Sequence, residues 1–200
     1  MTETAVYPSD CVQFDRFLNP AEQQRLFDFT LQREPEFVAT NTTTNSQDYR
    51  QSLVLYRFGE FYHLMVRRIQ AVLPEVLAQL GIAPFAIAQI EAQLTAHNDG
   101  HYYKLHNDNG SAETANRLLT YVYYFCQQPQ PFSGGELIVY DSRIENNFYV
   151  QADSYRAIEP RNNRIVFFRS RYLHEVLPVR CPSRRFADSR FTINGWIRQG

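Results

Sequence analysis

A chain of 200 residues is long enough for one domain with a substantial core, and its formal net charge of -1 gives no general attraction to nucleic acid or membranes. Its three cysteines have no metal-binding spacing, and the first residues lack the basic and apolar parts of a signal peptide, so we expect a cytoplasmic protein with reduced thiols. No apolar run reaches the ~18 residues that a membrane helix needs.

The basic residues are almost all arginine, with Lys104 as the single lysine, and arginine is frequent between Arg161 and Arg198. These arginines either present a local basic surface to an acidic partner, through the bidentate contacts that arginine favours, or are solvated and have no such role. The residues alone leave both interpretations open.

The N-terminal part predicts an extended lead-in over residues 1–18 and then a helix. Asn19-Pro20-Ala21-Glu22 is typical of a helix start, because Asn19 can cap the helix, Pro20 suits its first position and Glu22 completes a capping box. The helix is expected to run to about Arg33. From Val38 to Arg50 the sequence has no periodicity and predicts a loop, either a binding loop or an exposed connection.

A second helix is expected from about Glu60 to Ala71, where apolar residues recur at helical spacing. Pro74 is expected to restart the helix, and Gly81 to end it. Both helices have one apolar side, which predicts packing against a core and no chemical role.

After Pro84 the sequence predicts short strands separated by Gly, Pro, Asn and Asp turns, a pattern that favours an antiparallel sandwich or barrel. Strands are expected at Ala86–Ala96, Gly100–His106, Arg117–Phe125, Glu136–Tyr140, Ser154–Ile158, Arg164–Phe168, Leu173–Val179 and Ser189–Arg198. We therefore expect one domain over residues 1–200, with helical support in 1–83, a β core in 84–200, and the helices on the outer face of one sheet.

The residues that indicate chemistry are His106 and Asp108. On a strand, whose side chains alternate with period 2, their spacing would point both toward one face. A second imidazole, from His174, would complete the 2-His-1-carboxylate set that binds Fe(II) and leaves three coordination positions open. The H-x-D pattern alone is weak, because it also arises by chance.

Arg190 begins a late strand in which Thr192, Asn194 and Trp196 share its face. An arginine that points into a sandwich is costly unless an anion meets it. A dicarboxylic cosubstrate or an interior carboxylate such as Glu136 would supply that anion, and spacing does not decide between them.

The stretch YYKLHNDNGSAETANRLLTYVYYF resembles the core of the Fe(II)/2-oxoglutarate-dependent dioxygenases, in particular those of the prolyl 4-hydroxylase type. The family pattern is an H-x-D, an Arg-to-Tyr strand, a Gly-Gly turn, a distal His and an Arg followed by a Trp. All five parts occur here in order, over roughly residues 90 to 198. The resemblance implies a double-stranded β-helix (jelly-roll) fold.

The resemblance also implies roles for individual residues. His106, Asp108 and His174 would be the iron ligands. Arg190 would pair with the distal carboxylate of 2-oxoglutarate, Tyr124 would reach the same cosubstrate, and Thr192 would add a hydroxyl. Tyr103 matches a position near the substrate and the iron. For Tyr103 and Tyr124 the alternative is an ordinary aromatic residue of the core.

Two departures from the family pattern concern the cosubstrate site. Arg184 and Arg185 lie nearer to the usual spacing from the distal histidine, but Arg190 is preferred because its distance from Trp196 fits the last strand of the family. The tyrosine that the family often has on the strand before H-x-D is replaced here by Ala96 or His97. Either His97 substitutes for that tyrosine or the contact is lost. We expect His97, His101 and His63 to lie at the surface or to surround the metal ligands without binding the metal.

The implied cofactors are Fe(II), 2-oxoglutarate and O₂, with ascorbate as a candidate reductant and succinate and CO₂ as co-products. Halogenating relatives have a small residue in place of the carboxylate, so Asp108 favours hydroxylation. The expected substrate is an amino-acid unit, foremost a prolyl-type residue in a peptide or protein. The alternatives are a free amino acid or a small or carrier-bound natural-product intermediate with the same chemistry, and a non-catalytic metal-binding jelly-roll module.

Substrate choice is expected to lie in the loops Val38–Arg50, Asn109–Asn116 and Asp141–Asp153. Nucleic acid is not an expected partner, because the demethylating branch of the family has a longer arginine-containing motif than the residues after Arg190 provide. No membrane partner is expected, and the sequence does not indicate an oligomeric state.

Overall fold

The computed structural model describes residues 5–40, 49–145 and 148–200, and within them two α-helices accompany antiparallel strands. The helices are α1 (Pro20–Gln32) and α2 (Gly59–Gln79). Two short 3-10 helices are also present, η1 (Glu34–Glu36) and η2 (Phe186–Asp188). None of the described helices combines the length and apolar character needed to span a membrane.

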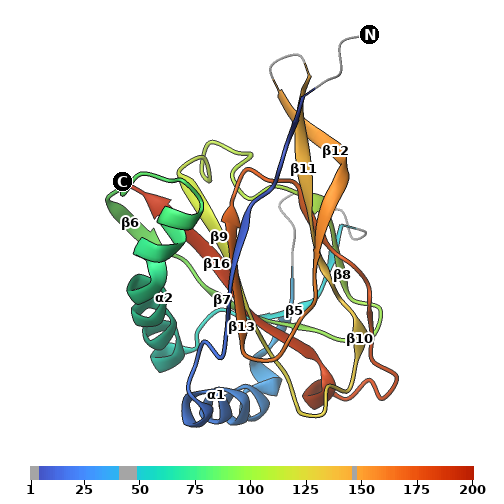
Figure 1. Cartoon of the computed structure of the whole chain (residues 1–200). Helices are drawn as coiled ribbons and strands as arrows, with labels where there is room; N and C mark the ends of the chain where they lie inside the picture. Colours follow the sequence, from blue (N-terminus) through green and yellow to red (C-terminus); the bar gives the residue numbers. More distant parts are fainter. Residues whose placement is uncertain (1–4, 41–48, 146–147) are drawn as a thin grey trace.

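The larger sheet carries both helices on its outer face (Figure 1). Within the described ranges its strands lie in the order β2 (Cys11–Asp15), β13 (Arg164–Arg169), β9 (Arg117–Phe125), β16 (Arg190–Gln199), β7 (Gln93–His97), β5 (Leu53–Leu55) and β3 (Val38–Ala39), with β6 (Ile87–Ile90) beside β16. The helices bury their apolar sides against this sheet, as the amphipathic patterns predicted.

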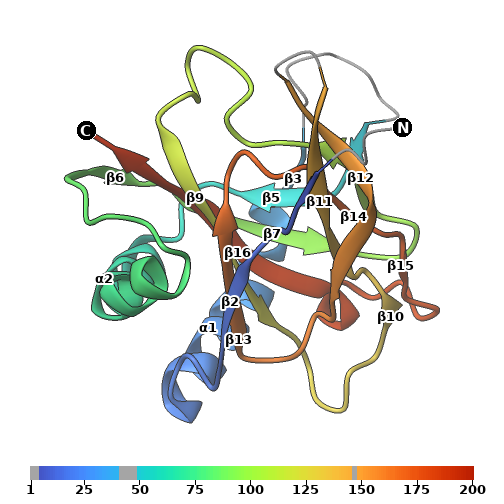
Figure 2. The same ribbon diagram turned by 45° about the horizontal axis from the view of Figure 1, so that its top comes forward.

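The smaller sheet faces the inner side of the larger one (Figure 2). Its described strands lie in the order β1 (Val6–Tyr7), β11 (Leu137–Glu145), β14 (His174–Val176), β8 (Tyr102–His106) and β4 (Arg50–Gln51), with β12 (Phe148–Ile158) paired to β11. A separate ribbon joins β10 (Ser133–Gly134) to β15 (Val179–Arg180). Two facing antiparallel sheets with outer helices are the expected jelly roll.

The side chains of strand β9 contribute alternately to two separate hydrophobic clusters. Tyr121, Tyr123 and Phe125 belong to the core beneath the helices, whereas Val122 and Tyr124 pack in the cluster between the sheets. This is the period-2 alternation of a strand that is buried on both faces.

The start of α1 is as expected, and the course of α2 is not. Asn19 Oδ1 accepts from the Glu22 backbone N–H at 2.9 Å, and Glu22 Oε2 accepts from the Asn19 backbone N–H at 3.1 Å, which completes the capping box. The predicted restart at Pro74 is wrong, because α2 runs through it. A proline inside a helix costs about 3 kcal/mol, and burial of the apolar side of α2 on both sides of Pro74 outweighs that cost. Gly81, with φ of 60°, follows the helix as expected.

The sheets extend into the segment before residue 84, which was expected to provide helical support. Strands β1 to β5 all precede that residue and pair within both sheets. The predicted loop Val38–Arg50 begins in β3 and ends in β4, and residues 41–48 lie outside the described ranges. Strands β1 and β2 lie in the segment 1–18 that was expected to be extended, whereas β3, β4 and β5 were not predicted, because strands of two or three residues have no periodic signal.

The predicted loop Asp141–Asp153 is instead part of the hairpin of β11 and β12, apart from residues 146–147, which lie outside the described ranges. Its first residue, Asp141, is hydrogen-bonded to residues far from it in sequence. Asp141 accepts hydrogen bonds from the hydroxyls of Ser9, at 3.0 Å, and Ser154, at 2.6 Å. The predicted loop Asn109–Asn116, by contrast, has no strand or helix.

We expect Asn163→Ala to lower the free energy of unfolding by about 3 kcal/mol, because it would leave several buried polar groups unpaired. The Asn163 side chain accepts from the Leu18 N–H at 2.9 Å and the Tyr123 hydroxyl at 3.0 Å, and donates to the Leu18 carbonyl at 2.8 Å. Chemical denaturation would measure the change. The control Gln24→Ala, at an exposed helical position, should stay within about 0.5 kcal/mol of the parent, and a loss below about 1 kcal/mol for Asn163→Ala would contradict this account.

Candidate active site

Strand pairing in the smaller sheet brings the two predicted histidines together. In the antiparallel register of β8 and β14, His106 lies directly opposite His174. The ring centroids of the two imidazoles are 4.2 Å apart. Ligand atoms of His106, Asp108 and His174 all lie within 4.8 Å of one another. Residues that are far apart in sequence therefore form one compact donor set.

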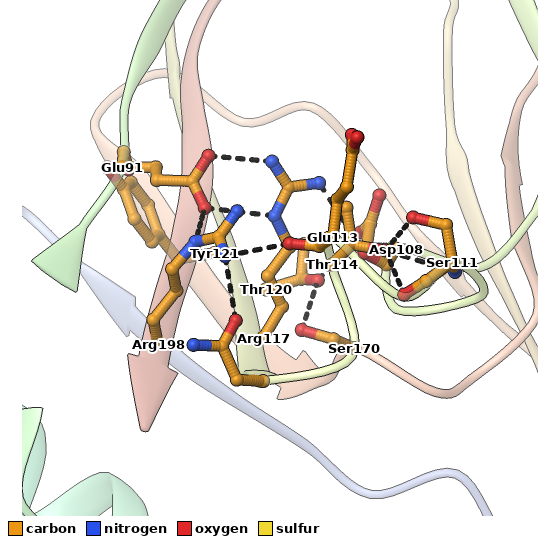
Figure 3. A network of polar contacts seen from close by, with 11 residues as sticks. Glu91, Asp108, Ser111, Glu113, Thr114, Arg117, Thr120, Tyr121, Ser170 and Arg198 are labelled. Atoms are coloured by element: carbon orange, nitrogen blue, oxygen red, sulfur yellow. Dashed lines mark hydrogen bonds and ion pairs between the residues drawn. The ribbon is translucent and has the colours of Figure 1, made fainter. Parts of the chain in front are cut away.

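Asp108 reaches this set by a route that the sequence pattern did not predict. Strand β8 ends at His106, so Asp108 lies beyond the strand and does not share a strand face with it. The Asp108 backbone N–H donates to the Ser170 carbonyl at 2.9 Å, and the Thr120 hydroxyl donates to Asp108 Oδ2 at 2.7 Å. Figure 3 shows Thr120 and Ser170 beside Asp108. Hydrogen bonds from β9 and the end of β13 thus orient the carboxylate.

Both imidazoles are held with Nε2 toward the carboxylate. Nδ1 of His106 lies 2.7 Å from the Lys104 carbonyl, and Nδ1 of His174 lies 2.9 Å from the Tyr172 carbonyl. Nε2 of His106 is 3.7 Å from Asp108 Oδ1, and Nε2 of His174 is 3.3 Å from Asp108 Oδ2. When the carbonyl accepts a hydrogen bond from Nδ1–H, Nε2 carries no proton and is free to bind a metal. This is the usual orientation of a ligating histidine.

The charges of the three groups are strongly coupled because their side chains are only 6 to 8% exposed. Burial lowers the pKa of His106 to about 3, with a further contribution from the charge of His174. Burial would raise the pKa of Asp108, but the neighbouring histidines and the Thr120 hydroxyl lower it below its usual value. The pKa of His174 is raised, because Asp108 outweighs the effect of burial. The carboxylate therefore stays ionised and attracts a cation.

Arg190 lines the same cavity as the three predicted ligands. Its residue is 2% exposed, and it makes no ion pair with Glu136 or any other described carboxylate. Its Nε has no hydrogen-bond partner in the described part of the chain, and one terminal nitrogen lies 3.4 Å from His97 Nδ1. A buried guanidinium without a carboxylate is costly, so this end of the cavity suits an anion.

Three other side chains line or border this anion subsite. The Tyr124 ring lies 5.0 Å from the Arg190 guanidinium, and the Tyr124 hydroxyl has no partner among described residues. Burial raises the pKa of Tyr124 to about 12, so the phenol keeps its proton as a donor. Thr192 is buried and lines the cavity. His97 is buried and lines the cavity too, beside Arg190, which is one of the two positions expected for it, and its Nε2 has no described partner.

Tyr103 contacts one member of the metal-ligand set and lines the same cavity. Its ring stacks on His106 with centroids 3.6 Å apart and an interplanar angle of 21°, and Tyr49 meets it edge-on. Burial raises the pKa of Tyr103 to about 12. Arg50, which the sequence reading placed at the end of a loop, lines the cavity beside Tyr103. Its position in the very short strand β4 gave no signal that could have identified it.

The other arginines and histidines that the sequence offered for this site lie outside the cavity. Arg185 is mostly exposed and pairs with Asp188 at 2.8 Å, and Arg184 is exposed and pairs with Asp99 at 3.0 Å. Neither lines the cavity, and neither do His63 and His101.

A salt-bridge network supports the wall behind Asp108 (Figure 3). Arg117 donates to both oxygens of Glu91, at 2.9 and 2.6 Å, and Arg198 also pairs with Glu91. The Arg117 guanidinium lies 3.6 Å from the ring centroid of Trp196, which lines the cavity, and 3.4 Å from the Asp108 carbonyl oxygen. The network joins β9 and β16 to the loop that carries Asp108.

The donor set fits Fe(II), because two imidazoles and one carboxylate are the ligands of non-haem iron oxygenases with open positions. The unpaired polar atoms of Tyr124, His97 and Arg190 fit a carboxylate ligand nearby. The residues present therefore fit both a divalent metal and a dicarboxylate.

Comparison with known proteins agrees with this assignment. A family model described as the 2OG-Fe(II) oxygenase superfamily matches residues 92–198. A PKHD-type hydroxylase from Synechocystis sp. is 48% identical over 200 residues, which cover 99% of this chain and 66% of that protein. The chain thus spans about two thirds of the length of this curated relative.

Solved structures support the fold. A prolyl-4-hydroxylase from Pseudomonas putida has a TM-score of 0.69 and 19% identity, covering 96% of this chain and 94% of that one. A prolyl hydroxylase from Trichoplax adhaerens, in complex with a hypoxia inducible factor peptide fragment, has a TM-score of 0.70 and 18% identity. The match covers 94% of this chain and 83% of that one. At these identities the likeness concerns the fold alone.

We expect Thr120→Val, which keeps the shape of the side chain, to weaken divalent-metal binding about 10- to 100-fold, because Asp108 would lose the hydroxyl that orients it. Calorimetric titration with Co(II) would measure the affinity. The control Thr95→Val removes a buried hydroxyl that bonds to Asn194 and does not touch the donor set. Equal metal affinity in Thr120→Val and the parent protein would contradict the role given to Thr120.

Proposed function

The chain belongs to the 2OG-Fe(II) oxygenase superfamily, and on that premise we propose that it is an Fe(II)/2-oxoglutarate-dependent dioxygenase that hydroxylates an unactivated C–H bond of an amino-acid unit. The observation that carries the proposal is a single cavity lined by His106, Asp108, His174 and the buried Arg190. A metal-binding donor set and an anion subsite within one cavity are what a 2-oxoglutarate dioxygenase requires.

In this proposal His106, Asp108 and His174 hold Fe(II), and Arg190 binds the distal carboxylate of 2-oxoglutarate by charge-assisted hydrogen bonds. In the proposal the Tyr124 hydroxyl, which has no hydrogen-bond partner among described residues, donates to the same anion. Thr192 would turn its hydroxyl to the anion from Asn194 Oδ1, to which it donates at 3.2 Å. When bound, Fe(II) and 2-oxoglutarate would supply the chemistry, in which O₂ is consumed and succinate and CO₂ are released while the substrate gains a hydroxyl.

The surrounding residues would orient these groups and limit water. Tyr103, stacked on His106, restricts the position of that imidazole and presents its phenol to the substrate side. Asp108 keeps a carboxylate in the donor set, which favours hydroxylation. Ascorbate would serve as a reductant that keeps the iron ferrous.

For the substrate, we propose foremost a prolyl-type residue in a peptide or protein. The names of the similar proteins support it: a prolyl-4-hydroxylase and a prolyl hydroxylase in complex with a peptide among the structures, and a PKHD-type hydroxylase among the relatives. The free-amino-acid alternative has one observation in its favour, the second cavity arginine, Arg50. The remaining alternative, a non-catalytic metal-binding module, predicts no turnover of 2-oxoglutarate.

The described chain is also consistent with the proposed cytoplasmic location, because Cys11, Cys126 and Cys181 are all free thiols. Nucleic acid is not part of the proposal.

We expect Arg190→Ala to weaken 2-oxoglutarate binding about 100-fold or more, because it removes the charge that meets a buried carboxylate. Anaerobic titration of the Fe(II) protein with 2-oxoglutarate, followed by the weak visible metal-to-ligand charge-transfer band, would measure this. Arg185→Ala is the matched control and should bind normally, since its side chain is exposed and paired with Asp188. If Arg185→Ala loses the band and Arg190→Ala keeps it, the anion subsite is wrongly assigned.

We expect His174→Ala to abolish both Fe(II) binding and O₂-dependent release of succinate from 2-oxoglutarate, because only two of three protein ligands would remain. His63→Ala changes an exposed histidine outside the cavity and should leave both unchanged. Wild-type protein that binds Fe(II) and 2-oxoglutarate but releases no succinate with any amino-acid or peptide substrate would support the non-catalytic module instead.

A further inference from the structure

The cavity holds a second arginine that the proposed chemistry does not use. Arg50 lies on β4, at the edge of the smaller sheet, where its backbone pairs with Tyr103 of β8. Its side chain lines the cavity that contains the metal-ligand set and Arg190. It therefore lies close to Tyr103 and is a second cation in this cavity besides Arg190.

The Arg50 guanidinium is held by a hydrogen bond and forms no ion pair with a described carboxylate. Its Nε donates to the Ser52 hydroxyl at 2.9 Å, and its Cζ lies 4.8 Å from the Tyr103 ring centroid. Ser52 is 3% exposed, so the hydrogen bond anchors the arginine to a buried group. Among described residues, Arg50 forms no ion pair.

The charges lining the cavity do not balance. Arg50 and Arg190 face a single described carboxylate, that of Asp108. The charge of Arg117, behind the cavity wall, is already met by Glu91. Fe(II) and the 2-oxoglutarate dianion would cancel each other, and Asp108 offsets one arginine. Counting only the described residues, one positive charge is left over, and because Arg190 is assigned to the cosubstrate it is that of Arg50.

Burial makes this excess charge costly. Burial lowers the pKa of Arg50, which means that its charged form is poorly solvated. A neutral internal peptide residue would cover the guanidinium further without neutralising it. A carboxylate would neutralise it and accept two parallel hydrogen bonds from its planar edge.

From these contacts and charges we propose that the substrate carries a free carboxylate, which Arg50 binds while the adjacent carbon skeleton lies over Tyr103 toward the metal. The inference rests on the proposed function, and it names the substrate class: a free amino acid, or a peptide whose C-terminal residue is the one modified. Both sources present the same group. An amino-acid skeleton is short enough for this geometry, since only the Tyr103 ring, stacked on His106, separates Arg50 from a metal ligand.

The test uses the fluorescence of Trp196, the sole tryptophan of the chain, which lines the cavity. Wild-type protein is loaded with Mn(II), which prevents turnover, and then with 2-oxoglutarate, each step giving its own binding curve. The probes are the proteinogenic L-amino acids as free acids, the matching carboxamides, and prolyl tripeptides that end in a free carboxylate or an amide. We expect at least one free acid to bind, and its carboxamide to bind at least tenfold more weakly.

Variants identify the group responsible. Arg50→Gln should weaken binding of that acid about 10- to 100-fold and remove its advantage over the carboxamide, whereas Arg50→Lys should retain part of the advantage. Arg25→Gln, which removes an exposed positive charge on α1, is the matched control and should bind like wild type. Unchanged 2-oxoglutarate binding in Arg50→Gln shows that the variant is folded.

The outcomes separate the inference from the proposed function. Failure of Mn(II) or 2-oxoglutarate to bind the wild-type protein overturns the proposed function. If both bind but no free acid does, or acids and amides bind equally, or Arg50→Gln keeps the preference, the carboxylate inference is overturned and the proposed function stands. Preference for free amino acids or for C-terminal tripeptide acids identifies the source of the carboxylate.

Discussion

The site depends on the antiparallel pairing of β8 with β14. This register sets His106 opposite His174, and the backbone carbonyls of Lys104 and Tyr172 hold each Nδ1 so that each Nε2 faces Asp108. A slip of one residue would turn one imidazole to the opposite face of the sheet and separate the donors. The rest of the inner cavity is arranged around this pair.

The second organising constraint is charge in a buried space. Arg190 is buried without an ion-pair partner among the described carboxylates, and Asp108 stays ionised because histidines and a hydroxyl surround it. Neither arrangement is favourable in an empty cavity. A bound cation would neutralise Asp108, and a bound dianion would neutralise Arg190. Ligand binding would therefore offset the cost of burying these two charges. Arg50 is a further positive charge in the cavity, and in our proposal the carboxylate of the substrate neutralises it.

Much of this could be predicted from the sequence, because local rules and tertiary packing agree there. The capping box of Asn19 and Glu22 depends on neighbours in sequence, and β9 has the bounds predicted from its β-branched and aromatic run. The histidines and Arg190 were found through the family pattern, which constrains their order along the chain but not their distances.

The failures have physical reasons as well. Pro74 does not interrupt α2, because burial of apolar side chains along the helix outweighs the cost of a proline in its interior. Rules based on local sequence count that cost but not the burial. Asp108 lies beyond the end of β8, held by Thr120 from another strand, a contact that period-2 spacing cannot reveal. Arg50 was missed because a two-residue strand has no periodic signal and gains its position only by pairing with β8.

The most direct test is a crystal structure of the protein grown anaerobically with Fe(II) and 2-oxoglutarate, with anomalous data collected at the iron edge. The account predicts one iron peak bonded to Nε2 of His106, the carboxylate of Asp108 and Nε2 of His174, with the distal carboxylate of 2-oxoglutarate on Arg190. Iron bound by other residues, or 2-oxoglutarate bound away from Arg190, would contradict it.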